Sequence, residues 1–280
     1  MSKAAAPLRP LVLGRRGAYE GVMHAHFVLA HPEPQSFNAH LVRAGAAALE
    51  AQGWTVSVSD LYAMGFDPCE RPEHFADRGA PARFDPQLEQ RHASEVGALP
   101  KVVTDELALM DRADLLVLQY PMWWHLPPAM MKGWFDRTLA YGDAYTSRKR
   151  FEKGRFVGKR AMLSVTVGTS RSTYEHDGRS GDIDLMLWPV NFTLAYVGYE
   201  VLAPFVAYGV EASLRYSDPA VVEARLKGIV VDFRATLPRV GERATIPFNR
   251  MAEWGEDGRI VAGAPVHSPF IRRRLRLELE

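Results

Sequence analysis

The segment Gln119–Arg137 places the strongest constraint on the fold of this chain, because it leads from a strand pattern through an aromatic loop to a helix start. The apolar run Leu115–Tyr120, which overlaps its beginning, predicts a buried strand. Proline is tolerated in the first turn of a helix, so Pro127 and Pro128 predict the start of a helix that continues to Leu139. The expected order is therefore strand, loop, helix.

The loop between this strand and this helix reads Met122, Trp123, Trp124, His125. In an open parallel sheet, the loops that follow the carboxyl ends of strands build the ligand site. Flat, apolar side chains in such a loop suit a flat ligand. Because two adjacent tryptophans cannot easily both point inward, we expect one to lie in the core and the other to face the ligand.

Composition excludes several classes of protein. The 280 residues are 47% hydrophobic and 24% charged, which is ordinary for a soluble globular protein. A net charge of +1 argues against nucleic-acid binding, and no apolar run reaches the roughly 18–20 residues of a membrane span. The lone Cys69 allows no internal disulfide, so we expect a cytoplasmic protein in a reducing environment.

The first predicted unit is a strand at Ala25–Ala30, a helix at Leu41–Gln52 and a strand at Thr55–Ser59, which together form a right-handed parallel crossover. The preceding His24 and the strand residue His26 share one face of the strand. A metal site needs more ligands, and no third one lies nearby in the sequence. We therefore expect two hydrogen-bonded histidines and no metal.

The loop after this first strand lacks the GxGxxG dinucleotide fingerprint. Ser36 and Asn38 nevertheless supply side-chain donors where a helix N-terminus points its free N–H groups. Ordinary capping by Asn38 would explain these residues equally well. The length of the loop and the added His31 and Ser36 favour an anion site.

The remaining segments continue the alternation. Residues Leu61–Pro100 show no sustained period and predict a long connection. The small-residue loop Gly168–Tyr174, after a predicted strand, lets backbone approach a ligand closely. The other predicted elements are a helix at Val102–Arg112, a strand at Lys159–Val167, a helix at Ile183–Val197, a strand at Tyr199–Phe205 and a helix at Asp218–Leu237.

Five strands alternating with helices predict an α/β fold with a doubly wound, five-stranded parallel sheet. We divide the chain into a disordered leader at 1–22, a flavin-binding domain at 23–237 and a small extended carboxyl-terminal appendage at 238–280. Three loops at strand ends should converge: one with phosphate contacts, one with aromatic surface and one with open backbone. Together they suit a flavin nucleotide.

The chain resembles the NAD(P)H:quinone oxidoreductases of the DT-diaphorase type, which have the flavodoxin-like fold. The resemblance implies a homodimer in which FAD, in preference to FMN, takes hydride from NAD(P)H and passes it to a quinone by a ping-pong route. The segments that carry the resemblance are Leu29–Asn38, Gly53–Pro68, Gln119–Arg137, Thr166–Tyr174 and Gly181–Val190.

The resemblance also implies residues for each part of the site. Those expected at the FAD phosphates and ribityl chain are His31, Ser36, Phe37 and Asn38. Those expected beside the isoalloxazine face are Pro121, Met122, Trp123 and Trp124, and those at its polar edge are Thr166, Val167, Gly168, Thr169 and Tyr174. Arg225 matches an arginine near the adenine, and Tyr145 matches a substrate-site tyrosine given across the dimer interface.

Several positions depart from the family pattern. They leave undecided which substrate is preferred and which residue acts in the proton relay. The loop usually reads Thr-Thr-Gly-Gly, but here it is Thr-Val-Gly-Thr over 166–169. His125 replaces a cofactor-facing phenylalanine, Ser147 a second substrate-site tyrosine, and Asp85 a glutamine. Ser180 stands where the family has the relay histidine. His176 could replace that histidine, although we favour an exposed His176 that takes no part.

Three alternative functions remain. The same flavin could reduce nitro, azo or other electrophilic acceptors. The chain could also be a regulatory flavodoxin-like subunit of a potassium efflux system, but such subunits are shorter and residues 238–280 argue against this. A one-electron carrier is typically small and acidic, and this chain is neither.

Overall fold

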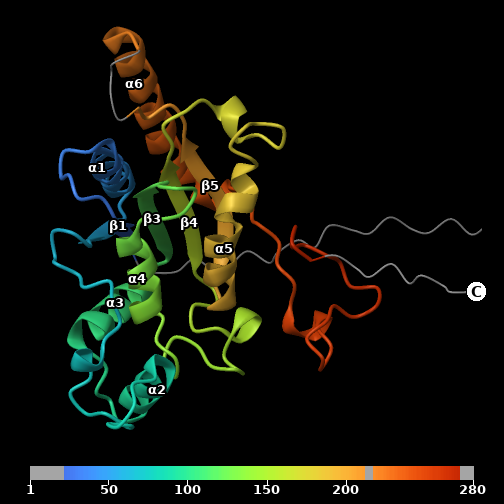
Figure 1. Ribbon diagram of the computed structural model, residues 1–280. Coiled ribbons are helices and arrows are strands. Elements are labelled where there is room, and N and C mark those ends of the chain that lie inside the picture. Colours follow the sequence, from blue (N-terminus) through green and yellow to red (C-terminus); the bar gives the residue numbers. More distant parts are fainter. Residues whose placement is uncertain (1–21, 212–216, 272–280) are drawn as a thin grey trace, which may run out of the picture.

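A five-stranded parallel sheet forms the centre of the molecule (Figure 1), as the strand pattern predicts. The computed structural model describes residues 22–211 and 217–271, so the predicted leader lies outside them apart from Val22. The strand order is β2-β1-β3-β4-β5. The strands are β1 His24–Leu29, β2 Thr55–Asp60, β3 Leu115–Pro121, β4 Arg160–Thr166 and β5 Glu200–Ala207.

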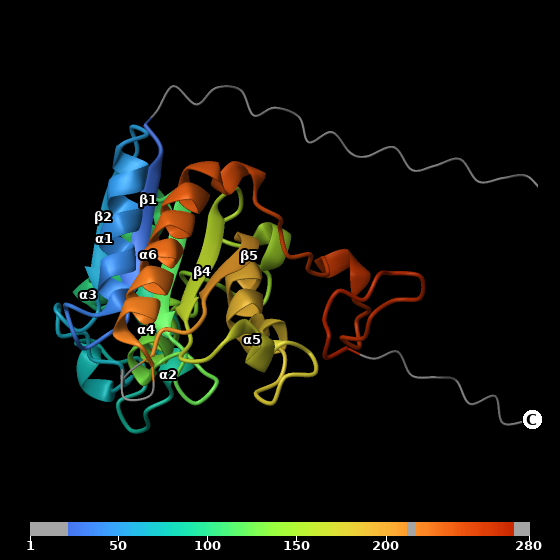
Figure 2. The same cartoon turned by 90° about the horizontal axis from the view of Figure 1, so that it is seen from above.

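Helices cover both faces of the sheet (Figure 2): α1 and α6 lie on one face, and α3, α4 and α5 lie on the other. The helices are α1 Phe37–Glu50, α2 Pro86–Glu95, α3 Lys101–Arg112, α4 Ala129–Thr138, α5 Ile183–Tyr196 and α6 Pro219–Thr236. Within the described ranges, none of them is both long and apolar enough to cross a membrane.

The position of β3 between two layers of helices explains the apolar run Leu115–Leu118 in its sequence. Successive side chains of a strand point to opposite faces. Leu115 and Val117 join the core beneath α1 and α6, whereas Leu116 and Leu118 join the core beneath α3, α4 and α5. Because both faces are covered, both sets must be apolar.

The long connection predicted over Leu61–Pro100 contains a helix, α2, that the sequence pattern does not indicate. Asp85 caps the helix by accepting from the N–H groups of Gln87 and Leu88. The buried face of α2 carries Glu89 and Gln90 instead of an apolar stripe. A helix whose buried face is polar gives no hydrophobic period, which is why the pattern is missed.

Residues after α6 begin by covering the free edge of β5. The Ala203 N–H donates to the Ala244 carbonyl at 2.8 Å, and the Ile246 N–H donates to the Val201 carbonyl at 2.8 Å. This antiparallel pairing protects an edge that would otherwise expose unpaired backbone groups. The chain then runs outward beside α5 (Figure 2). The division into a domain and an appendage at 237/238 stays a prediction.

Both strand histidines are buried and hydrogen-bonded, as expected. His26 lies 2.8 Å from the Ser57 hydroxyl. The ring of His24 lies 2.7 Å from the Thr55 hydroxyl through Nδ1, and Arg112 Nη2 approaches its Nε2 at 3.1 Å. Since arginine only donates, His24 Nε2 accepts and Nδ1 carries the proton. Burial, followed by the charge of Arg112, lowers the pKa of His24.

This shift predicts that His24 makes the protein less stable in mild acid. The unfolded chain regains a histidine pKa near 6.5, so below about pH 6.5 it binds a proton that the folded protein does not. When the pH is lowered from about 7.5 to about 5.5, the free energy of unfolding should therefore fall in both proteins. We expect the fall to be smaller in the His24→Gln variant than in the unsubstituted protein, by roughly 1 kcal/mol. Urea denaturation at several pH values measures this difference.

The exposed His40 offers a matched control. We expect the His40→Gln variant to keep the pH dependence of the unsubstituted protein. If His24→Gln and His40→Gln gave the same curve, His24 would not be the group responsible.

Candidate functional site

The candidate site lies where β1 and β3 end side by side. All five strands are parallel, so their carboxyl ends share one edge of the sheet. The helix that follows β1 covers one face and the helix that follows β3 covers the other (Figure 2). In open α/β sheets the crevice that holds the ligand lies at such a reversal, so we place the candidate site at this carboxyl edge.

The three loops expected to converge meet at this edge. The rings of His31, from the loop after β1, and Trp123, from the loop after β3, have centroids 6.0 Å apart. The Met122 N–H donates to the carbonyl of Thr166 at 2.9 Å, which fixes the loop after β3 to the end of β4. The site therefore combines segments that are far apart in the sequence.

Asn38, in the first turn of α1, connects this helix to β3 and β4. Its Nδ2 donates to the Thr166 hydroxyl at 3.0 Å, and its Oδ1 accepts from Gln119 Nε2 at 2.8 Å. Asn38 lies inside α1 and its amide is bonded to β3 and β4, so it does not cap the helix. Ser36 is the cap, since its hydroxyl accepts from the Ala39 N–H at 3.2 Å. The alternative of capping by Asn38 was thus wrong.

Gln119 is a residue that the sequence analysis did not assign to the site. Its signal is a polar side chain inside the apolar run of β3, two positions before the end of the strand. It is fully buried and holds Asn38 in place. Its Oε1 has no hydrogen-bond partner among the described residues, which leaves an acceptor beneath the crevice.

His31 has a defined tautomer. The Glu33 N–H donates to His31 Nδ1 at 3.0 Å, so Nδ1 accepts and Nε2 carries the proton of the neutral ring. Burial lowers the pKa of His31 more than the neighbouring Glu33 raises it. His31 is therefore a neutral donor through Nε2 at neutral pH.

The tryptophan loop forms a tight turn that contradicts one prediction. Trp123 and Leu126 exchange two backbone hydrogen bonds of 3.0 Å, and Trp124 and His125 between them have φ of 52° and 63°. Trp123 is 42% exposed and Trp124 92% exposed. Neither lies in the core, where Trp134 of α4 is found instead.

This turn is strained, because side chains other than glycine rarely adopt positive φ. The left-handed conformation costs roughly 1–2 kcal/mol per residue, and two adjacent residues adopt it here. Such strain concentrates at ligand clamps and active sites. It also directs the Trp124 and His125 side chains away from the core.

The loop after β4 has open backbone, as predicted. A Cβ added to Gly168 would meet only the Val210 carbonyl, at 3.8 Å. The adjacent Thr169 hydroxyl is buried and has no partner among the described residues, whereas Val167 is buried in the core. The loop thus offers a ligand both free space and an unpaired hydroxyl.

Tyr174 and Ser180 lie close together in the same loop, and His176 does not join them. Tyr174 ends the 3₁₀ helix Arg171–Tyr174 and packs against the core. The Ser180 N–H donates to the carbonyl of Thr173 at 3.0 Å, which brings the two segments together. His176 is exposed.

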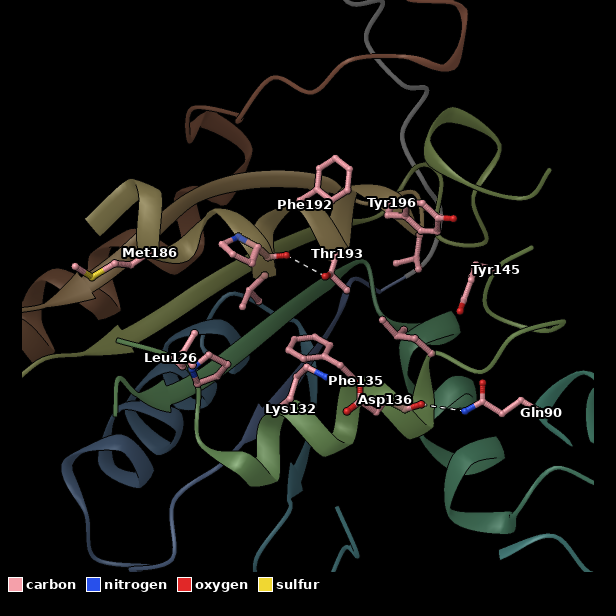
Figure 3. A pocket seen from close by; sticks show the side chains of 15 residues that line it. Gln90, Leu126, Lys132, Phe135, Asp136, Tyr145, Met186, Phe192, Thr193 and Tyr196 are labelled. Carbon is pink, nitrogen blue, oxygen red and sulfur yellow. Dashed lines mark hydrogen bonds and ion pairs between the residues drawn. The ribbon is translucent and has the colours of Figure 1, made fainter. Parts of the chain in front are cut away.

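Tyr145 lies at a distance from the tryptophan loop. A hollow of about 510 Å³ runs between α4 and α5, with Leu126 and Met186 toward one end and Tyr145 toward the other (Figure 3). Tyr145 is half-buried against Tyr196, and Ser147 is exposed. Within one chain, the predicted substrate tyrosine therefore does not meet the predicted flavin residues.

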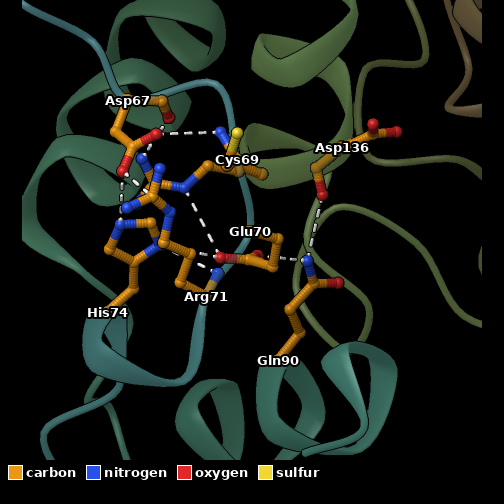
Figure 4. Close-up of polar contacts among 8 residues, drawn as sticks. Asp67, Cys69, Glu70, Arg71, His74, Gln90 and Asp136 are labelled. Carbon is orange, nitrogen blue, oxygen red and sulfur yellow. Dashed lines mark hydrogen bonds and ion pairs between the residues drawn. The ribbon is translucent and has the colours of Figure 1, made fainter.

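The far end of this hollow is fixed to the long connection by polar contacts. Gln90 Nε2 donates to Glu70 at 2.9 Å and to the Asp136 carbonyl of α4 at 3.0 Å (Figure 4). His74 lies between Asp67 and Glu70, 3.3 and 3.2 Å from their carboxylates. The connection therefore forms one wall of the hollow.

A second hollow, of about 720 Å³, lies between α1 and α6 next to the cap of α1. Phe37 and His40 line it from α1, with their rings stacked at 6.2 Å. Apolar residues of α6, among them Val222 and Leu226, line the other side. Arg225 faces a different cavity, on the β5 side of α6.

Comparison with known proteins assigns the chain to a family. The model of the flavodoxin-like fold matches residues 23–228. This match covers most of the chain and includes every strand of the sheet and all three loops. The chain therefore belongs to the flavodoxin-like fold family.

Comparison with individual proteins identifies the branch of this family to which the chain is similar. NAD(P)H dehydrogenase [quinone] 1 of Cavia porcellus is 40% identical over 188 residues, covering 66% of this chain and 68% of that protein. Ribosyldihydronicotinamide dehydrogenase [quinone] of Homo sapiens is 34% identical over 82% of this chain and 96% of its own. A candidate quinone reductase from Klebsiella pneumoniae superposes with a TM-score of 0.75 at 32% identity, covering 83% and 91%. Within the flavodoxin-like fold, the chain is a member of this family of quinone dehydrogenases.

Proposed function

We propose that this protein is a flavin-dependent NAD(P)H:quinone oxidoreductase that transfers two electrons as hydride by a ping-pong route. The observation that carries the proposal is the meeting of three different surfaces at one edge of the sheet. The α1 N-terminus with Ser36 suits phosphate, the tryptophan turn suits an aromatic ring, and the Gly168 loop suits a polar ring edge. The family relationship supports the same chemistry.

We propose FAD, and not FMN, as the bound flavin. The first N–H groups of a helix have no partner within the helix, so the start of α1 attracts phosphate groups. His31 adds a neutral donor, and the Phe37 and Asn38 N–H groups belong to the same turn. The hollow between α1 and α6 begins at Phe37 and has room for an adenosine. FMN would leave this hollow empty.

The isoalloxazine would lie against the tryptophan turn. Aromatic side chains stack on flat rings, and Trp123 and Trp124 are exposed beside the half-buried Met122 and the buried Pro121 at the end of β3. His125, next to them, is a polar side chain where a flat substrate would approach. The strained backbone holds these side chains outward before any ligand binds.

A bound flavin supplies the hydride acceptance from NAD(P)H and the hydride donation to the acceptor. The protein must stabilise the negative charge that develops at the polar edge of the ring. The Tyr174 hydroxyl, the unpaired Thr169 hydroxyl and the backbone of Gly168 can donate hydrogen bonds there. Thr166 is engaged with Asn38 and positions this loop.

We also propose a homodimer with shared sites. The wall of the hollow between α4 and α5 is mainly apolar, with Phe135, Phe192 and Tyr196 among its residues. A second copy placed on this face by a two-fold axis would bring its Tyr145 to the tryptophan loop, which the Tyr145 of the same chain does not reach. The free, exposed Cys69 supports a cytoplasmic location.

The tryptophan turn yields the first functional prediction. Trp124→Ala should weaken flavin binding about two- to tenfold, because stacking gives roughly 0.5–1.5 kcal/mol beyond buried area. Flavin absorbance during dialysis measures the retention, and the released flavin identifies FAD or FMN. The unsubstituted protein should reduce quinones with NAD(P)H faster than it reduces nitro or azo compounds.

Leu88→Ala provides the control for this variant, since Leu88 is an exposed apolar residue on α2. It should keep full flavin content. A Trp124→Ala protein with unchanged flavin affinity would show that the turn does not stack on the cofactor. A preference for nitro or azo acceptors would make the protein a reductase of those electrophiles.

The second functional prediction concerns the proton relay. A serine hydroxyl does not titrate near pH 7, whereas a histidine does. Tyr174→Phe should slow flavin reduction by on the order of tenfold, since the remaining donors keep part of the stabilisation. Ser180→His should raise the rate or make it depend on pH, and His176→Ala should change little. Stopped-flow reduction by NAD(P)H across pH measures all three variants.

A large loss of rate in His176→Ala, together with a vanished pH dependence, would contradict this assignment. His176 would then be the substitute for the missing relay histidine. The exposed position of His176 favours the opposite result.

The third functional prediction concerns assembly. Phe192→Glu places a charge on the apolar face between α4 and α5, so it should shift the protein from dimer to monomer and lower quinone reduction. Sedimentation at micromolar concentration measures the shift, and the melting temperature shows whether the fold is kept. Leu88→Glu, outside this face, should stay dimeric. Full activity in an unsubstituted monomer would refute the shared site.

A further inference from the structure

A cavity of about 300 Å³ lies on the outer side of β5, between this strand and α6. Three arginines from three different segments line it: Arg171 from the loop after β4, Arg225 from α6, and Arg243 from the segment that follows α6. Asp232 is the one carboxylate in its wall. None of these residues lines the hollow proposed for the flavin adenosine; Arg225, which the resemblance matches to an arginine near the adenine, faces this cavity instead.

Two of the three arginines lack an ion-pair partner within residues 22–211 and 217–271. Arg171 is exposed, and its guanidinium lies 4.9 Å from the centre of the Tyr208 ring. Arg243 is half-buried and donates to the carbonyls of Ala203 and Pro204. Burial lowers the pKa of Arg243, because its charge has lost water without gaining a carboxylate.

Arg225 is only partly compensated. Its Nη2 donates to the Glu211 carboxylate at 2.8 Å. Its Nε is buried and has no hydrogen-bond partner among the described residues. The cavity wall thus holds three guanidinium groups and the carboxylate of Asp232, Glu211 pairs with Arg225, and the charges of Glu175, Asp182 and Asp184 act on Tyr208 from nearby. The half-buried guanidinium groups of Arg225 and Arg243 have lost part of their water, and an anion would stabilise them.

The cavity adjoins the proposed flavin site. Arg171 and Tyr174 are the first and last residues of one 3₁₀ helix. The Tyr208 ring lies between them, 6.2 Å from the Tyr174 ring and beneath the Arg171 guanidinium. A ligand that reaches the flavin edge at Tyr174 could therefore extend past Tyr208 to the arginines.

We infer that this cavity binds the 2′-phosphate of NADPH and makes the protein prefer NADPH to NADH. The inference rests on the proposed function, because that function makes a reduced nicotinamide dinucleotide the ligand of the neighbouring site. Arginine binds phosphate oxygens through two parallel N–H groups. An arginine near the adenosine ribose is a common means of accepting a 2′-phosphate. The source of the phosphate could also be the flavin itself, which the experiment distinguishes.

Flavin reduction by NADPH and by NADH tests the inference in the flavin-loaded protein. Charge-assisted hydrogen bonds are strong, so Arg171→Gln should raise the NADPH concentration for half-maximal reduction by on the order of tenfold. The NADH value should stay unchanged, and Arg171→Lys should recover part of the loss. Arg179→Gln, an exposed arginine nearby on the same loop, removes the same charge and should affect neither donor.

Calorimetric titration provides a second readout that needs no catalysis. The purified protein should bind 2′,5′-ADP more tightly than 5′-AMP, and Arg171→Gln should abolish the difference. Equal loss with NADPH and NADH, or equal binding of the two nucleotides, would overturn the inference. Loss of flavin from Arg171→Gln would instead assign the cavity to the phosphate of the flavin.

The two proposals fail in different ways. A protein that binds no flavin and reduces no quinone would refute the proposed function, while the nucleotide titration would still measure the 2′-phosphate preference of the cavity. A protein that reaches half-maximal flavin reduction at the same concentration of NADPH and of NADH would keep the proposed function and refute the inference.

Discussion

The hydrogen bonds of the Asn38 amide hold the candidate site together. This one buried side chain joins the first turn of α1 to Gln119 of β3 and Thr166 of β4. A buried amide that lost these partners would cost roughly 1–3 kcal/mol per unsatisfied group. The amide therefore fixes the phosphate end of the crevice relative to the Gly168 loop. Both parts belong to rigid elements, which is how a site keeps its geometry without a ligand.

The three surfaces of the candidate site offer a ligand different kinds of contact. The start of α1 offers fixed N–H groups, and the Gly168 loop offers space that no side chain fills. The tryptophan turn instead keeps Trp124 in water at the cost of two residues with positive φ. Exposed aromatic surface and backbone strain are both unfavourable in the isolated chain. A flavin ring stacked on Trp124 would cover this exposed aromatic surface. Strained turns of this kind are typical of ligand sites.

The sequence predicts much of the fold because most strands are apolar runs followed by loops with distinctive residues, and β2 shows the alternation of a strand. It fails at α2, whose buried residues Glu89 and Gln90 give no hydrophobic period. It also misplaces a tryptophan in the core, since a left-handed turn at Trp124 leaves no local signal without glycine. Partners such as Asn38 and Thr166 are 128 positions apart, and no local pattern connects them. The uncompensated charges of Arg171 and Arg243 likewise become visible only once β5 and α6 are in place.

The most direct test of the account is an anaerobic titration of the purified protein. The central claim is that one bound flavin accepts hydride from NAD(P)H and passes it to a quinone. One equivalent of NADPH per flavin should bleach the flavin absorbance, and one equivalent of quinone should then restore it without an accumulated radical spectrum. A chain that carries no flavin, or a reduced flavin that quinone reoxidises only through a one-electron radical, would contradict the account.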